Sequence, residues 1–184
     1  MKLKLSPKTK AVIREYAESI VIALILALIV RTFIVQAFKI PTGSMRPTLV
    51  EGDRILVNKF IYRFKDPRAG DIIVFKYPED PKRDFIKRLV ATGGQKLSIK
   101  DGRIYVDGKA LSGYGHFEQR YYYNQGTFGE EGETILVPKN SFFVLGDNSA
   151  SSRDSRYWGF VPRRNLVGKA FFLYWPPTRV RLTK

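Results

Sequence analysis

Hydrophobic and polar positions divide the chain at about residue 37. A nearly continuous apolar run, YAESIVIALILALIVRTFIV, covers residues 16–35. Twenty helical residues rise about 30 Å, which is the thickness of the hydrocarbon core of a bilayer. Arg31 lies four residues from the far end of the run, close enough for its long side chain to reach the interface. The pattern therefore predicts a transmembrane helix over residues 16–36.

The fifteen residues before this run are basic. Residues 1–15, MKLKLSPKTKAVIRE, carry four lysines and one arginine. Because basic flanks stay in the cytoplasm, residues 37–184 are expected outside it. A cleavable secretion signal is the alternative, with an apolar core at residues 20–30 and the small-residue site VQA at 35–37. Both alternatives place the rest of the chain outside the cytoplasm.

After residue 37 the pattern changes to short runs rich in β-formers, each bounded by Gly, Pro, Asp or Asn. Such regular spacing predicts a mainly β domain, an antiparallel sheet or barrel-like catalytic fold. The segment DGRIYVDGKAL has Asp-Gly turns at both ends and predicts a hairpin arm. Residues 113–133, rich in Gly and Tyr, are typical of a loop or insertion. The expected strand runs are 54–64, 71–77, 85–92, 96–100, 103–108, 134–138, 141–146 and 169–175.

Composition restricts the chemistry. The net charge of +15 indicates a polyanion nearby, either nucleic acid or an anionic membrane surface. Cysteine is absent and His116 is the single histidine, so a disulfide framework, a thiolate zinc site and a cysteine nucleophile are excluded. His116 lies in the Gly/Tyr loop with no motif around it, which argues against a Ser-His-Asp triad. We expect no metal and no cofactor.

A serine nucleophile in this chain would therefore need lysine as its base. The stretch FKIPTGSMRPTL, directly after the apolar run, supplies candidate hydroxyls. A lysine must lose its charge to act as a base, and burial favours the neutral amine. In DFIKRLVAT, strand alternation puts Lys87 on one face with Phe85 and Leu89, where desolvation is plausible. A lysine on an edge strand that reaches solvent is the alternative.

A third stretch, GDNSASSRDSRYWG at residues 146–159, is rich in small hydroxyls. A hydroxyl there could orient a neutral lysine amine by accepting a hydrogen bond. Asp154 and Arg156 could pair and hold the loop in shape. A flexible linker is the alternative interpretation.

The order of these stretches resembles the bacterial type I signal peptidases, membrane-anchored serine proteases with a Ser-Lys dyad. The resemblance covers nearly the whole chain, through IPTGSMRPTL, GDRILVNKF, GDIIVFKYP, FIKRLV and GDNSASSRDSRYWGFVP. It implies that Ser44 is the nucleophile, that Lys87 is the general base and that Ser152 orients the lysine. It also implies an oxyanion hole formed by the Ser44 N–H and the Thr42 hydroxyl.

The resemblance extends to the surroundings of the site. Gly43 would permit close approach of the substrate backbone, and Asp154 and Arg156 would form a structural pair near the site. The chain departs from the family at Ser149, where an arginine is frequent, and at ATGGQ (91–95), where GLPGD is frequent. These departures leave the local loop geometry and finer specificity open. The implied substrate pockets, which accept small residues, are lined by Phe38, Ile40, Met45, Leu49, Phe85 and Ile86.

The resemblance implies a cell-membrane serine endopeptidase that cuts preproteins after small-x-small sites through an acyl-enzyme. It further implies a single membrane pass with the N-terminus in the cytoplasm, contact with anionic lipids, proximity to the secretion translocon and no nucleic-acid partner. A conjugation-type Ser-Lys peptidase stays open as a close alternative. A self-cleaving repressor should begin with DNA-binding helices instead of an apolar run. A non-enzymatic exported protein that binds polyanions is the alternative from another class.

Overall fold

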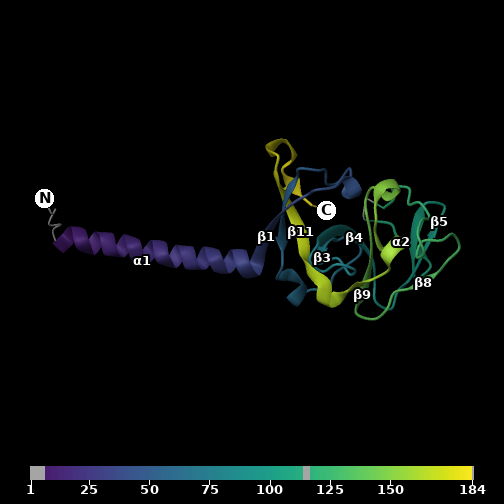
Figure 1. The fold of residues 1–184 in the computed structure, drawn as a ribbon, viewed down its shortest axis with the longest axis horizontal. Coiled ribbons are helices and arrows are strands. Elements are labelled where there is room, and N and C mark those ends of the chain that lie inside the picture. The colour runs from purple at the N-terminus through teal and green to yellow at the C-terminus, as the bar shows by residue number, and fades with distance from the viewer. Residues whose placement is uncertain (1–6, 114–116, 184) are drawn as a thin grey trace.

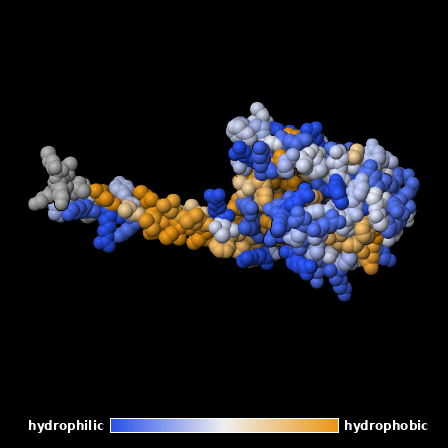
Figure 2. All heavy atoms as spheres, in the orientation of Figure 1, coloured by the Kyte–Doolittle hydropathy of each residue, from blue (hydrophilic) through white to orange (hydrophobic). Residues whose placement is uncertain are grey.

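A long helix projects from a β domain in the computed structural model, which describes residues 7–113 and 117–183 (Figure 1). The α-helix α1 spans Pro7–Ile29 and continues as a π-helical turn, Val30–Ile34. Figure 2 shows its apolar middle between a hydrophilic N-terminal end and a mostly hydrophilic domain surface. Within the described residues, this helix is the one that is long and apolar enough to cross a membrane. His116 lies outside the described residues.

The larger sheet is antiparallel and eight-stranded, with the order β1-β2-β11-β3-β4-β9-β10 and β12 paired with β11. It curls into a half-barrel, and β-bulges interrupt the pairings of the long strand β11. Its strands are β1 (Val35–Lys39), β2 (Arg54–Asn58), β3 (Ile72–Lys76), β4 (Asp84–Thr92), β9 (Ser141–Leu145), β10 (Val161–Pro162), β11 (Leu166–Trp175) and β12 (Arg181–Leu182).

The second sheet has four short strands in the order β7-β6-β5-β8. The Asp101-Gly102 and Asp107-Gly108 pairs all have positive φ and form the two turns of its hairpins, as the Asp-Gly signals predict. Between residues 117 and 133 there is no helix or strand. The strands are β5 (Lys96–Lys100), β6 (Arg103–Val106), β7 (Lys109–Ala110) and β8 (Ile135–Leu136).

The predicted mainly antiparallel β architecture is confirmed, and a strand overlaps each of the eight predicted runs. The run 54–64 is strand only to Asn58 and ends in a 3₁₀ turn, Ile61–Arg63. At the end of the apolar run, Val35 and Gln36 are strand residues paired with Asn58 and Val57. The predicted helix extended to residue 36, two residues into β1, because a short apolar stretch does not distinguish helix from strand.

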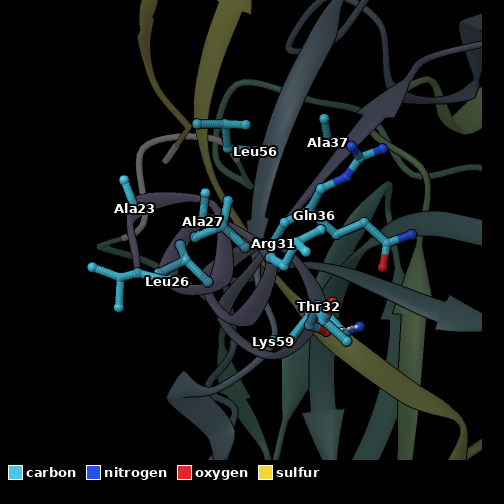
Figure 3. A pocket seen from close by; sticks show the side chains of 12 residues that line it. Ala23, Leu26, Ala27, Arg31, Thr32, Gln36, Ala37, Leu56 and Lys59 are labelled. Carbon is cyan, nitrogen blue, oxygen red and sulfur yellow. Dashed lines mark hydrogen bonds between the residues drawn. The ribbon is translucent and has the colours of Figure 1, made fainter. Parts of the chain in front are cut away.

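An open groove of about 1010 Å³ lies where the helix meets the domain, between the helix, β1 and β2. Figure 3 shows Leu26 and Ala27 on its helix side, and the Arg31 side chain extending from the helix toward Ala37 of the domain. The Lys59 Nζ donates to the carbonyl of Thr32 at 3.0 Å across this junction. Arg31 thus points away from the helix and toward the domain.

Candidate active site

The first element of the site is the turn that follows β1. After the Ile40 N–H donates to Asp53 O at 2.8 Å, the chain enters a 3₁₀ turn, Gly43–Met45. Met45 is fully buried in the half-barrel core, and its carbonyl accepts the Leu49 N–H at 2.9 Å. Burial of this side chain fixes the position of the Ser44 hydroxyl beside it, because a closely packed core leaves few alternative placements.

The second element is β4, which brings Lys87 to the serine. Lys87 pairs with Ile73 of β3 in the sheet, and its side chain is buried, with 4% exposure. Its Nζ lies 2.6 Å from Ser44 Oγ, in a hydrogen bond between residues 43 positions apart. Nζ also lies 5.6 Å from the centre of the Phe85 ring, so the two side chains share a face as strand alternation predicts.

Burial lowers the pKa of Lys87 to about 8 from an ordinary value of 10.5. The carboxylates of Asp154 and Asp147 act in the opposite direction and favour the ammonium form, whereas the Arg156 guanidinium adds to the lowering. Desolvation is the largest of these effects, since a buried ammonium loses the hydration that stabilises its charge. A useful fraction of Lys87 is therefore neutral at mildly alkaline pH, and the neutral amine can accept a hydrogen bond from the Ser44 hydroxyl.

The third element is the segment that follows β9. The Asn148 backbone N–H donates to Ser44 O at 3.0 Å, and its side-chain Nδ2 donates to Gly43 O at 3.1 Å. A Cβ on Gly146 would lie 2.0 Å from Ser152 Oγ and 2.6 Å from Ser44 O, distances that no real Cβ shows. The turn Gly43–Met45 is thus held against the segment that follows β9, and only a glycine at position 146 allows so close an approach.

Asp154 and Arg156 form the expected pair, with 2.8 Å between Oδ1 and Nε and no exposure of either side chain. Asp154 Oδ2 also accepts the Gly146 N–H at 2.9 Å. Arg156 Nη1 donates to Ser149 Oγ and to Tyr123 O, at 2.9 and 2.7 Å. Ser149, a departure from the family, is therefore a buried acceptor within this network.

Two other predicted residues, Ser152 and Thr42, lie beside the turn that contains Ser44, and their hydrogen bonds do not test the roles predicted for them. Ser152 Oγ is buried beside Gly146 and has no hydrogen-bond partner among the described residues. Thr42 precedes the 3₁₀ turn with an exposed side chain, which makes no capping hydrogen bond to that turn. Both hydroxyls are available to other partners, and their predicted roles stay predictions.

The residues implied for substrate pockets divide into two groups. Ile40, Met45 and Leu49 belong to the buried core of the half-barrel, with at most 2% exposure. Phe38, Phe85 and Ile86 are half-buried, and they present surface that a peptide can contact. The exposed surface of this predicted set therefore lies on β1 and β4.

One buried network near the turn Gly43–Met45, centred on Asp147, was not predicted from the sequence. Arg88 holds Asp147 through two hydrogen bonds, Nε to Oδ1 and Nη2 to Oδ2, each 2.8 Å. Thr48 Oγ1 donates to Asp147 at 2.5 Å, and Arg120 Nη1 lies 2.5 Å from the same carboxylate. Burial by itself would raise the pKa of Asp147, but the two guanidiniums and the Thr48 hydroxyl hold it below its ordinary value. The sequence signal for this network was Arg88, which strand alternation places on the other face of β4 from Lys87. A guanidinium buried there requires a carboxylate as its partner.

Among the described residues, no cluster of three His, Asp or Glu side chains could hold a metal ion. The residues gathered around Ser44 are instead hydroxyl, amine and amide groups, together with the two buried ion pairs. This set suits acyl transfer by an activated serine.

Comparison with known proteins decides the family. The profile described as "Signal peptidase, peptidase S26" matches residues 13–175. The chain belongs to the signal peptidase family. It is 40% identical over 174 residues to the probable signal peptidase I-2 of Synechocystis sp., covering 91% of this chain and 76% of that protein. It is 38% identical over 181 residues to the signal peptidase I of Leptolyngbya laminosa, covering 95% and 85%. It is 34% identical over 215 residues to that of Aquifex aeolicus, covering 88% and 84%.

Family membership confirms the predicted resemblance and the enzyme class. The chain is a membrane-associated serine endopeptidase of the signal peptidase I family, and its substrates are preproteins that carry signal peptides.

Proposed function

We propose that this signal peptidase cuts preproteins after small-x-small sites with a Ser44–Lys87 dyad, through an acyl-enzyme. The observation that carries the proposal is the 2.6 Å contact between Ser44 Oγ and a buried Lys87 whose pKa is lowered to about 8. In this pairing the nucleophile and its base lie within hydrogen-bond reach, and the base has a pKa near the working pH.

In the proposed reaction, Ser44 Oγ attacks the scissile carbonyl carbon while the neutral amine of Lys87 takes the hydroxyl proton. The tetrahedral oxyanion accepts hydrogen bonds from the Ser44 N–H and the Thr42 hydroxyl. Collapse breaks the C–N bond, Lys87 returns its proton to the leaving amine, and an ester on Ser44 results. Lys87 then takes a proton from water, whose oxygen attacks the ester carbonyl. The C–Oγ bond breaks, Lys87 passes this proton to Ser44 Oγ, and the signal peptide leaves with a free carboxyl end. Loss of one oxyanion donor costs about 10²–10³ in rate in comparable enzymes.

Two open strand edges support an extended substrate. β1 is an edge strand of the larger sheet, and residues 84–87 of β4 pair with β3 alone, because β9 begins to pair at Arg88. A peptide strand added between these edges presents alternate side chains to the half-buried Phe38 and Ile86. The preference for small residues follows from the family resemblance.

A permanent single-pass anchor, with its N-terminus in the cytoplasm, is part of the proposal. Ala37 pairs with Leu56 in the middle of β1, so cleavage after VQA would cut a strand that the sheet uses. The basic first residues favour a cytoplasmic N-terminus. Ser44 follows the helix within about ten residues, and a preprotein still held by its apolar segment offers its cleavage site at the same depth. Shared anchoring raises the effective concentration of the substrate. The net charge of +15 favours anionic lipid headgroups, and a neighbouring translocon would supply the substrates.

The test uses the full chain in detergent with a preprotein that carries an Ala-x-Ala site. We expect Ser44→Ala and Lys87→Ala each to lose about 10³-fold or more in cleavage rate, because each removes one half of the dyad. Ser112→Ala and Lys100→Ala, which change exposed residues of the same types, are the matched controls and should retain full activity. Mass spectrometry of the products identifies the bond that is cut.

Activity retained by Ser44→Ala or Lys87→Ala would reject the dyad. Activity on conjugation-type substrates but not on the preprotein would favour the related Ser-Lys peptidase. Circular dichroism of each variant separates a chemical loss from misfolding. Polyanion binding without cleavage, unchanged in both dyad variants, would favour the non-enzymatic alternative.

A further inference from the structure

A small basic cleft lies beside Pro47 and Thr48, between the segment that contains Arg120 and the strand β12. Its volume is about 300 Å³, and its polar lining includes Thr48, Gln119, Arg120, Arg181 and Thr183. One water occupies about 30 Å³ of liquid, so the cleft has room for a phosphate-sized group and several waters. It is separate from the dyad and has no part in the proposed cleavage.

The cleft has more positive than negative charge. Arg120, which lines the cleft, lies 2.5 Å from an Asp147 oxygen through Nη1 and donates through Nη2 to Thr48 Oγ1 at 2.7 Å. Arg181 forms no ion pair with any described residue, and it donates through Nη2 to the Thr48 carbonyl at 2.5 Å. The neighbouring Arg179 is neutralised by Asp53 at 3.0 Å. Among the described residues that line the cleft, two are arginines and none is acidic.

A buried hydroxyl in the same cleft has no partner. Thr183 is 9% exposed, and its Oγ1 makes no hydrogen bond to any described residue. A buried donor without a partner is destabilising, so an occupant that accepts from it is favoured. The position of Thr183 is set by its backbone, whose N–H donates to Phe171 O at 3.0 Å.

We propose that this cleft binds a phosphate group, with Arg181 and Thr183 on one wall and Arg120 on the other. Arginine has five N–H donors in a fixed fork, and the contacts above engage only part of them on Arg181 and Arg120. Donors that approach from two walls suit a tetrahedral oxyanion, which has an oxygen for each wall, better than a planar carboxylate. The phosphate belongs either to an anionic lipid headgroup or to free phosphate.

The first measurement is the ³¹P line broadening of inorganic phosphate titrated with the full chain in a zwitterionic detergent, at constant ionic strength. We expect Arg181→Gln to weaken phosphate binding about tenfold, since a charge-assisted hydrogen bond is lost, and Thr183→Val to weaken it about threefold. Arg181→Lys, which keeps the charge but not the fork, should fall between the wild type and Arg181→Gln.

The matched control is Arg164→Gln, which removes the same charge from an exposed residue beside the first end of β11, whereas β12 pairs near the other end. Arg164→Gln should bind phosphate as the wild type does. No binding by the wild type, or equal weakening in Arg164→Gln and Arg181→Gln, would overturn the proposal. Circular dichroism checks that each variant is folded.

The second measurement identifies the source of the phosphate by the thermal midpoint in micelles doped with phosphatidylglycerol or phosphatidylcholine of equal chain length. A larger shift with phosphatidylglycerol that Arg181→Gln abolishes supports the lipid headgroup. Equal shifts with both lipids, together with phosphate binding that Arg181→Gln weakens, support free phosphate. All measurements can use the Ser44→Ala background, so their outcome does not depend on the proposed cleavage.

Discussion

Lys87 and Arg88 are neighbours on β4, both are buried cations, and their environments differ completely. Lys87 has a serine hydroxyl as its near partner, and burial lowers its pKa to about 8. Arg88 donates two hydrogen bonds to Asp147 and a third to Gly70 O at 2.7 Å. Since strand neighbours point to opposite faces, one strand carries a destabilised charge on one side and a neutralised charge on the other. The first arrangement suits proton transfer and the second suits a scaffold.

The largest expected effect is the loss of stability on substitution of Arg88. Arg88→Met leaves the buried Asp147 with Arg120 as its remaining cationic partner, and Gly70 O loses a donor. Removal of one partner of a buried pair costs about 3–5 kcal/mol, so the free energy of unfolding should fall by about that amount. Denaturant unfolding measures it, with Arg103→Met as the exposed control. A loss below about 1 kcal/mol would mean that Arg120 alone satisfies Asp147.

Substitution of Lys87 is expected to change the free energy of unfolding in the opposite direction. Between pH 8 and 10.5 the unfolded chain holds a proton on Lys87 that the folded chain has released, so wild-type stability rises with pH across that window. Below pH 8 the full cost is present, at about 3 kcal/mol. Lys87→Met should therefore stabilise the protein at pH 7, and this advantage should disappear above pH 10.5. Denaturant unfolding at pH 7 and pH 11 tests this, with Lys100→Met as the exposed control; equal stability of Lys87→Met and the wild type at pH 7 would contradict a desolvated Lys87.

The pH dependence of cleavage tests the same amine in the active enzyme. If the neutral form of Lys87 is the base, kcat/KM should rise about tenfold per pH unit up to about pH 8 and then level off. At pH 6 the rate should be about 100-fold below its plateau. The measurement needs a preprotein cleavage assay from pH 6 to 10 at constant ionic strength. A profile that is flat from pH 6 to 8 would exclude Lys87 as the titrating base.

The smallest expected effect concerns Ser152, whose buried hydroxyl lies beside Gly146 and makes no hydrogen bond to any described residue. If this hydroxyl orients the neutral amine during the reaction, Ser152→Ala should lower kcat about tenfold and leave KM and the unfolding free energy nearly unchanged. Ser151→Ala changes an exposed serine in the same segment and serves as the control. A Ser152→Ala enzyme with wild-type kcat would remove Ser152 from the mechanism.

The strand runs and the hairpin arm were predictable from the sequence, because alternation and Asp-Gly turns are local signals. Strand β1 was not, because its apolar residues continue the helical run without a break and only pairing with β2 distinguishes them. Ser44 and Lys87 were predictable as candidates through the family resemblance. The Asp147 network was not, because its partners Thr48, Arg88 and Arg120 lie up to 99 residues from it in the chain.

The sequence by itself determined the kinds of element and the available chemistry: an apolar helix, short strands, no cysteine, and serine and lysine as the reactive residues. The tertiary structure alone decided that Ser44 Oγ and Lys87 Nζ, from residues 43 positions apart, lie 2.6 Å from each other. It also decided that water is excluded from one amine while the guanidinium beside it is paired. The reason is physical, since local patterns report backbone preference, whereas a pKa depends on solvent and charge contributed by distant segments.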